Sequence, residues 1–384
     1  MPMHKTLLTA SILATCTFAF ADAKLEILKP GSPTAATPTV RPASRENVII
    51  YKEPGRYGGW PANHGLWQWG DEMVVGFTST WYKSTMTDHR IDRTKPSYEI
   101  QARSLDGGKT WKTEENQPFA DGKTEAKPAP LTDPLDFTAP DFVLRFRFGG
   151  LHAGPSWFYT STDRCKTWRG PFSFAVEGVE GICTRTDLIV LGPRDCRMFG
   201  SCGKQNDGKA GRVCCARTID GGVTWKFVSY IGDEPQPGGF AIMPSTVRTK
   251  SGALLTTIRM GKPSADIQLW RSEDLGKTWQ HVSAVTGNIG GNPPATVLLP
   301  DGRLCVTYGY RRKPTGMRAR ISTDEGKTWQ PEIVIRDDGF DGDLGYPRAL
   351  VRPDGRLFTA YYYNGPREED RCIEGTFWTP PSVP

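Results

Sequence analysis

Charged and aromatic side chains that could do chemistry recur at two kinds of position along this chain. One set surrounds the starts of short apolar runs: Trp60, Asn63, His64, Asp141, Arg185, Asp187, Tyr346 and Arg348. The other set follows the next apolar runs: Asp88, His89, Asp92, Arg259, Arg311 and Arg312. Arginines can hold a substrate carboxylate by bidentate bonds, and tyrosine, histidine and aspartate can move protons or attack carbon. Together the two sets predict acid–base or covalent chemistry on an anionic substrate.

Each of these residues also has a structural interpretation. Asp141 or Asp187 can form a salt bridge with an arginine, and His64 or His89 can hydrogen-bond a loop carbonyl. A catalytic interpretation therefore requires that the fold bring the whole set together on one face.

The elements that would position these residues are indicated by an eight-residue pattern that occurs five times. The copies are Ser104–Trp111, Ser161–Trp168, Thr218–Trp225, Ser272–Trp279 and Ser322–Trp329, and their closing tryptophans recur every 50–57 residues. Asp-x-Gly between two strand-like runs is typical of a hairpin turn, and the tryptophan packs behind it. We therefore expect Asp106, Asp163, Asp220, Asp274 and Asp324 to hold turns together. Arg164-Cys165 departs from the pattern in the second copy and predicts a distorted turn there.

A repeat of this length predicts a repeat architecture. Six units begin with similar apolar runs, one more than the number of eight-residue copies, and each unit has room for four strands. This predicts an all-β, six-bladed β-propeller with four-stranded antiparallel blades. The strand Asn47–Tyr51 would complete the last blade and close the ring. In such a ring, the starts of the inner strands and the loops after the second strands converge on one face.

The eight-residue pattern resembles the Asp-box, or BNR repeat, of the sialidase superfamily, and the resemblance covers nearly all of the mature chain. Sialidases hold the substrate carboxylate with three arginines and use a tyrosine nucleophile paired with a glutamate, with an aspartate as acid/base. The resemblance implies that Tyr346 is the nucleophile and that Arg259, with Arg311 or Arg312, holds the carboxylate. It places the acid/base at Asp88 or Asp92.

Two departures point away from an ordinary sialic acid hydrolase. Gly59-Trp60-Pro61 stands where the family has Arg-Ile-Pro, so Arg56 is the nearest arginine. Met243 stands where the glutamate that assists the tyrosine is expected. The sequence therefore predicts a sialidase-like hydrolase acting on a carboxylated sugar of a glycan, with Trp60 available to stack on a sugar face.

Two alternatives remain open at this point. His64 or His89, with a tyrosine and an arginine, would also suit a polysaccharide lyase that cleaves a uronate glycan by β-elimination. A propeller that binds glycans without turnover is the third possibility, because a fold does not guarantee chemistry.

The remaining features concern compartment and partners. Lys5, the apolar run Leu7–Phe20 and a small-residue cleavage site near Ala21 predict a secretory signal over residues 1–21, and hence a secreted or periplasmic protein. A Pro- and Thr-rich leader is expected over 22–45, followed by one propeller domain over 46–380. No apolar run is long enough to span a bilayer. The net charge of +6 lacks a clustered basic stripe, which argues against nucleic acid as a partner.

Cofactors and oligomers are not indicated by the sequence. We expect no cofactor, no metal and a monomer. In an exported protein, the cysteines of the third repeat favour disulfides over zinc, because Cys-x-x-Cys spacing and nearby histidines are missing. These cysteines are Cys183, Cys196, Cys202, Cys214 and Cys215.

Overall fold

The computed structural model describes residues 38–86, 89–114, 127–150, 154–365, 367 and 371–381. They belong to one compact unit, Pro38–Pro384. Strands and turns make up nearly all of the described residues, and the 3-10 turn η1 (Pro61–Asn63) is the single helix among them. No helix among the described residues is long and apolar enough to cross a membrane. The predicted signal, residues 1–21, and most of the predicted leader lie outside the described residues.

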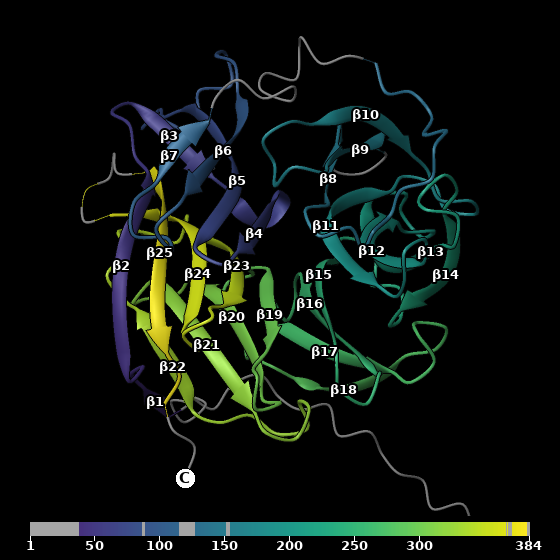
Figure 1. Ribbon diagram of the computed structural model, residues 1–384. Coiled ribbons are helices and arrows are strands. Elements are labelled where there is room, and N and C mark those ends of the chain that lie inside the picture. Colours follow the sequence, from purple (N-terminus) through teal and green to yellow (C-terminus); the bar gives the residue numbers. More distant parts are fainter. Residues whose placement is uncertain are drawn as a thin grey trace, which may run out of the picture. The chain divides into compact units, whose positions relative to one another are not determined.

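Six antiparallel sheets form the blades of a six-bladed β-propeller, as predicted (Figure 1). Blade 1 contains β3 (Arg56–Gly59), β4 (Gly65–Trp69), β5 (Glu72–Trp81), β6 (Tyr98–Ser104) and β7 (Lys112–Glu114). Blade 2 contains β8 (Val143–Phe148), β9 (Ser156–Ser161) and β10 (Arg169–Phe174). Blade 3 contains β11 (Cys183–Val190), β12 (Cys196–Gly203), β13 (Ala210–Thr218) and β14 (Lys226–Ile231).

The other three blades continue the same order. Blade 4 contains β15 (Ala241–Arg248), β16 (Leu254–Met260), β17 (Ile267–Ser272) and β18 (Gln280–Ala284). Blade 5 contains β19 (Pro294–Leu298), β20 (Leu304–Tyr310), β21 (Gly316–Ser322) and β22 (Glu332–Arg336), with β1 (Thr39–Val40) added in parallel to β22. Blade 6 contains β23 (Gly345–Val351), β24 (Leu357–Asn364), β25 (Arg371–Thr379) and β2 (Ser44–Tyr51). The inner strands β11, β15, β19, β23 and β4 contact one another in sequence and surround the central funnel.

The N-terminal part of the described chain closes the ring. Strand β2 pairs antiparallel with β25, from Ser44 opposite Thr379 to Tyr51 opposite Ile373. This confirms the prediction that Asn47–Tyr51 completes the last blade. The domain begins earlier than position 46, however, because Thr39 and Val40 already pair with blade 5.

Blade 2 departs from the four-stranded pattern. Strand β8 pairs directly with β9, and β9 leads into the turn at Asp163, so β8 occupies the place of a second strand. Among the described residues, blade 2 has no strand inside β8. Asp141, predicted to lie at the start of an inner strand, therefore precedes the second strand of blade 2 instead, and that prediction is wrong.

The five Asp-box turns, centred on Asp106, Asp163, Asp220, Asp274 and Asp324, share one hydrogen-bond scheme. In the last copy, Asp324 Oδ1 accepts from Ser322 Oγ at 2.7 Å and Thr328 N at 2.9 Å, and Asp324 Oδ2 accepts from Thr328 Oγ1 at 2.6 Å. The second copy keeps the scheme, with Thr167 and Ser161 donating to Asp163. Its turn is therefore not distorted, although Arg164 (φ 61°) and Cys165 (φ 65°) take the left-handed conformation that favours glycine.

The cysteines serve as small apolar residues of the core. All eight cysteines from Cys165 to Cys372 are buried free thiols, so the predicted disulfides are absent from the structure. One reason is strand geometry, because adjacent residues of a strand face opposite sides of the sheet. Cys214 packs with Cys196 and Cys202 on one side of blade 3, and Cys215 packs with Phe199 and Leu254 on the other.

Candidate active site

The inner strands of four blades are interrupted where they face the funnel. In blade 1, η1 separates β3 from β4, and register shifts lie between Thr184 and Leu188, Ile242 and Ser245, and Gly345 and Arg348. Bulges of this kind turn side chains out of the regular pleat and are common beside active sites. At three of them the residue before a proline has a left-handed backbone: Trp60 (φ 58°), Met243 (φ 56°) and Tyr346 (φ 50°). Non-glycine residues rarely adopt this conformation, and it concentrates at functional sites.

A cavity of about 380 Å³ opens beside these bulges. Its lining residues are Trp60, Asn63, His64, Thr78, His89, Arg93, Ser97, Glu99, Phe146, Arg147, Phe148, Arg185 and Tyr346. Strand β8 contributes the stretch Phe146–Phe148, on the side where blade 2 has no inner strand. Because blade 2 has no inner strand among the described residues, residues of its second strand face the cavity.

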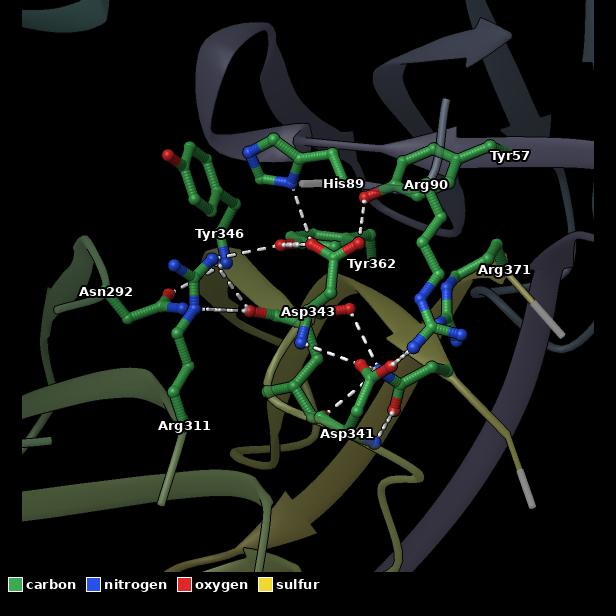
Figure 2. Close-up of polar contacts among 12 residues, drawn as sticks. Tyr57, His89, Arg90, Asn292, Arg311, Asp341, Asp343, Tyr346, Tyr362 and Arg371 are labelled. Carbon is green, nitrogen blue, oxygen red and sulfur yellow. Dashed lines mark hydrogen bonds and ion pairs between the residues drawn. The ribbon is translucent and has the colours of Figure 1, made fainter. Parts of the chain in front are cut away.

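Tyr346 lies among cations at one end of the cavity. Its hydroxyl accepts a hydrogen bond from Arg259 Nη1 at 3.0 Å, and the guanidinium carbons of Arg259 and Arg311 lie 5.7 Å from its ring centre. Its backbone N–H donates to Asn292 Oδ1 at 3.0 Å, which fixes the strained turn (Figure 2). Burial raises the pKa of Tyr346, but the charges of Arg259, Arg311 and Arg185 outweigh burial and leave the pKa below its ordinary value.

The structure distinguishes the two adjacent arginines left open by the sequence. Arg311 Nη2 donates to the Tyr362 hydroxyl at 3.0 Å and faces Tyr346, whereas exposed Arg312 donates to the Asn288 carbonyl at 2.8 Å. Met243 Sδ lies 3.8 Å from Arg259 Nη1. The Met243 thioether therefore lies beside Arg259, the arginine that hydrogen-bonds Tyr346. A thioether cannot act as a base for the phenol.

His89 belongs to a network centred on Asp343. His89 Nδ1 lies 2.7 Å from Asp343 Oδ1, Tyr362 donates to the same oxygen at 2.8 Å, and Tyr57 donates to Oδ2 at 2.9 Å (Figure 2). Burial raises the pKa of Asp343, but the bonds from His89, Tyr362 and Tyr57 outweigh burial and hold the pKa below its ordinary value. Asp343 is therefore an ionised acceptor at neutral pH.

His64 has a different environment at the other wall. It is 2 % exposed; its Nδ1 accepts from Arg145 Nη2 at 2.6 Å, and its Nε2 lies 3.0 Å from Thr78 Oγ1. Burial lowers its pKa well below the ordinary value, and Arg145, Arg147 and Arg348 lower it further. A neutral ring with both nitrogens engaged holds the wall together rather than transferring protons.

Glu99 is the carboxylate of the cavity lining among the described residues. Its Oε2 lies 3.4 Å from Arg145 Nη2 and 3.2 Å from Arg147 Nη1. Glu99, Arg145 and Arg147 come from strands of two neighbouring blades. They form a second polar group beside the cavity that sequence reasoning missed.

Several predicted site residues hold the funnel together. Arg185 Nε donates to Asn63 Oδ1 at 2.7 Å and its guanidinium lies 5.0 Å from the Phe148 ring centre, so both residues form part of the cavity wall. Arg348 donates to the Ala62 carbonyl at 2.8 Å, and its burial lowers its pKa to about 10. Asp187 accepts from Thr246, and burial raises its pKa to about 7.

Other predicted residues lie away from the cavity lining. Arg56 donates to Ser79 and packs on Trp81. Asp92 accepts from Thr94 N and Oγ1 in a local turn. Asp141 accepts from Arg164 at 2.7 Å, beside the second Asp-box turn, which corrects its predicted place at the funnel mouth. Asp88 lies outside the described residues.

Trp60 lines the cavity between blade 1 and blade 6. Its ring meets His89 edge-on, with centres 5.1 Å apart, and contacts Tyr57 and Tyr362. One face of a sugar could pack against such a cluster of rings. In the described part of the chain, no group of three His, Cys, Asp or Glu side chains gathers as a metal-binding set.

Sequence comparison identifies the family. Residues 121–359, more than half of the chain, match the BNR repeat-like domain. A sialidase from Micromonospora viridifaciens is 25% identical over 258 residues, which cover 64% of this chain and 33% of that protein. The chain thus spans about a third of the length of this relative.

Structural comparison agrees on the fold. A protein of unknown function from Dyadobacter fermentans has a TM-score of 0.68 at 23% identity, covering 89% of this chain and 99% of that one. Trypanosoma rangeli sialidase in complex with sialic acid has a TM-score of 0.56 at 14% identity, covering 88% of this chain and 59% of that one. The chain belongs to the BNR repeat-like domain family, and its six-bladed β-propeller is similar to the fold of known sialidases.

Proposed function

We propose that this protein is a glycoside hydrolase that acts on a carboxylated sugar of a glycan, with Tyr346 as the nucleophile. The observation that carries the proposal is the position of the Tyr346 hydroxyl, 3.0 Å from Arg259 Nη1 and beside Arg311. Arginines around a tyrosine serve two purposes, because they attract a substrate carboxylate and they favour the phenolate.

The cations compensate for the missing glutamate. A phenol is a weak nucleophile while its proton is held, and Met243 cannot remove that proton. Arg259, Arg311 and Arg185 lower the pKa of Tyr346 instead. The phenolate oxygen would attack the anomeric carbon as the bond to the leaving oxygen breaks, and water would then release the sugar from the tyrosine.

Binding would use the cavity together with the arginines that contact Tyr346. The carboxylate of the sugar would lie against Arg259 and Arg311, and its ring would lie beside Trp60. Glu99 lines the cavity and would accept hydrogen bonds from sugar hydroxyls, while Arg145 and Arg147 keep it ion-paired. These interactions favour a sugar that carries both a carboxylate and free hydroxyls.

The second candidate is a uronate lyase, and it is favoured by one observation. His89 is anchored through Nδ1 and lines the same cavity as Tyr346, so it could take the proton next to a substrate carboxylate. His64 offers no comparable base, since both its ring nitrogens are engaged.

An activity screen on acidic glycans tests the proposal. Reducing ends and the ultraviolet absorbance of unsaturated products are measured on the same samples. New reducing ends without unsaturated product support the hydrolase. Unsaturated product supports the lyase, and binding without turnover supports a glycan-binding propeller.

We also propose that the protein is exported and works outside the cytoplasm, as the signal predicted over residues 1–21 implies. Cell fractionation followed by N-terminal sequencing tests this. Recovery of the uncleaved chain from the cytoplasm would contradict it.

A further inference from the structure

His89 is held on two sides but leaves one ring nitrogen available. Asp343 lies 2.7 Å from Nδ1 and Trp60 packs edge-on against the ring. About one third of the side chain is exposed, and the residue lines the cavity. Within the described part of the chain, no contact occupies Nε2. The ring is thus fixed in place with one nitrogen open to the cavity.

Asp343 determines which nitrogen exchanges a proton. Its carboxylate is ionised, because Tyr362, Tyr57 and His89 all bond to it. An ionised acceptor keeps the proton on Nδ1, so protonation and deprotonation occur at Nε2. The backbone N–H of Asp343 donates to Asp341 Oδ1 at 2.9 Å, and Arg371 Nη2 donates to Asp341 Oδ2 at 2.9 Å. The carboxylate is therefore fixed by a second layer of contacts (Figure 2).

Tyr362 connects this pair to the carboxylate-binding arginines. Its hydroxyl donates to Asp343 and accepts from Arg311 Nη2 at 3.0 Å, and its ring lies edge-on to Tyr346 with centres 5.8 Å apart. Tyr362 and His89 thus bond to the same oxygen of Asp343, and the Tyr346 ring packs edge-on against Tyr362 (Figure 2). A sugar bound between Tyr346 and Arg311 would present its glycosidic oxygen to this region.

The other candidates for the acid/base role among the described residues already have hydrogen-bond or ion-pair partners in the protein. Asp92 is bound by Thr94, and His64 has both nitrogens engaged. Glu99 is paired with two arginines, and a carboxylate in such a pair is a poor proton donor.

We propose that His89 is the general acid/base of the reaction and that Asp343 is its positioning residue; this rests on the proposed hydrolase function. In the first step, the Tyr346 oxygen bonds to the anomeric carbon, the bond to the leaving oxygen breaks, and that oxygen takes the proton from His89 Nε2. In the second step, Nε2 takes a proton from water, the water oxygen bonds to the anomeric carbon, and the phenolate leaves. Both steps together consume one water and restore the enzyme.

The dependence of the rate on the leaving group tests this role. His89→Ala and His89→Gln are assayed on two glycosides of the sugar found by the screen. One glycoside releases a nitrophenol, and the other releases an alcohol, namely the hydroxyl of a second sugar. Nitrophenolate leaves without protonation, whereas an alcohol needs the acid. We expect kcat/KM to fall by about a hundredfold or more on the alcohol glycoside, and to change little on the nitrophenyl glycoside. On the nitrophenyl glycoside kcat should still fall, because the second step lacks a base to activate water. Azide needs no base, so adding it should restore kcat on this substrate.

Two further variants separate positioning from folding. Asp343→Asn should show the same leaving-group dependence with a smaller loss, because His89 remains but is no longer held by a charge. His281→Ala is the matched control, since that exposed ring contacts Gln268 on an outer strand and should leave both rates unchanged.

Opposite outcomes contradict the proposal in distinct ways. Equal losses on both glycosides, or full activity of both His89 variants, would overturn the role of His89 while leaving the hydrolase intact. Unsaturated product from the unaltered enzyme, or no turnover of any glycoside, would overturn the hydrolase and this proposal with it.

Discussion

The two ends of the propeller blades use similar side chains in opposite ways. At the Asp-box end, five aspartates repeat one scheme, in which a serine or threonine two residues before and a threonine four residues after both donate to the carboxylate. At the funnel end, four bulged strands occupy comparable places but carry different residues, among them Trp60, Arg185, Met243 and Tyr346. Residues that recur in every repeat stabilise the fold, whereas residues that differ from repeat to repeat line the candidate site.

The contrast extends to how completely each polar group is bound. The Asp-box carboxylates use both oxygens within their own turn. Tyr346 and His89 each have contacts on one side and face the cavity on the other. Substitutions at the two ends should therefore affect different measurements.

The largest expected effect is that of Tyr346→Phe. This change keeps the ring but removes the oxygen of the proposed nucleophile, so kcat should fall by at least about a hundredfold, while substrate binding and melting temperature stay nearly constant. Steady-state kinetics and thermal denaturation measure both. Tyr230→Phe on β14 is the control, and an active Tyr346→Phe enzyme would place the chemistry elsewhere.

Arg259→Ala should weaken binding of the carboxylated sugar and also reduce kcat, because the charge of Arg259 lowers the pKa of Tyr346; turnover should not be abolished, since Arg311 and Arg185 remain. Losing a charge-assisted bond of about 1.5–3 kcal/mol predicts a Kd for the carboxylated sugar that is roughly 10- to 100-fold higher. Binding of a neutral analogue should not change, as calorimetry can show. Arg312→Ala provides the matched control because Arg312 faces solvent. Equal effects of the two substitutions would contradict the assignment of the carboxylate site.

Asp324→Ala should have the opposite profile. Removing a turn carboxylate that accepts several hydrogen bonds should lower the free energy of unfolding by about 1–2 kcal/mol, with kcat of the folded enzyme unchanged. Urea denaturation and steady-state assays test the two statements. Loss of activity without loss of stability would break the contrast between the two ends.

The smallest expected effect is the pH dependence of the difference in unfolding free energy between the unaltered protein and Asp324→Ala. Asp274 and Asp324 have pKa values of about 2 in the folded protein, chiefly because threonine and serine donors outweigh burial. Since these values lie below the ordinary value of 3.8, the stabilisation is fully present above about pH 4 and is lost as the pH falls towards 2. Unfolding curves of the unaltered protein and Asp324→Ala should therefore converge in acid. A gap that persists at pH 2 would show that the carboxylate charge is not responsible.

Local signals explain why the architecture was predictable. Turn residues act within eight positions, so the Asp-box turns, the six units and the closing strand could be inferred from sequence alone. The inner strand missing from blade 2 could not, because Ala139-Pro140-Asp141 looks like the other strand starts. Asp141 pairs instead with Arg164. Arg164 stands in the second Asp-box where the first has Gly107, and this difference can be seen in the sequence.

The site was predictable only where each residue acts through its own strand end. Tyr346, Arg259 and Arg311 were predicted in this way and lie together in the structure, while their roles stay predictions. Glu99 and Asp343 were missed because their partners come from neighbouring blades, and only tertiary packing brings those together. The aspartate pair of Asp341-Gly342-Asp343, separated from Gly345-Tyr346 by Leu344, was the available signal.

Pairing of β2 with β25 also has a consequence for the timing of assembly. Tyr57 and His89 come from blade 1, whereas Asp343, Tyr346 and Tyr362 come from blade 6, so the His89–Asp343 contact crosses the seam where the two ends of the propeller meet. A ribosome must finish β25 before the seam can join. The proposed catalytic centre can therefore form only after the whole propeller has been synthesised, when the first and last blades come into register.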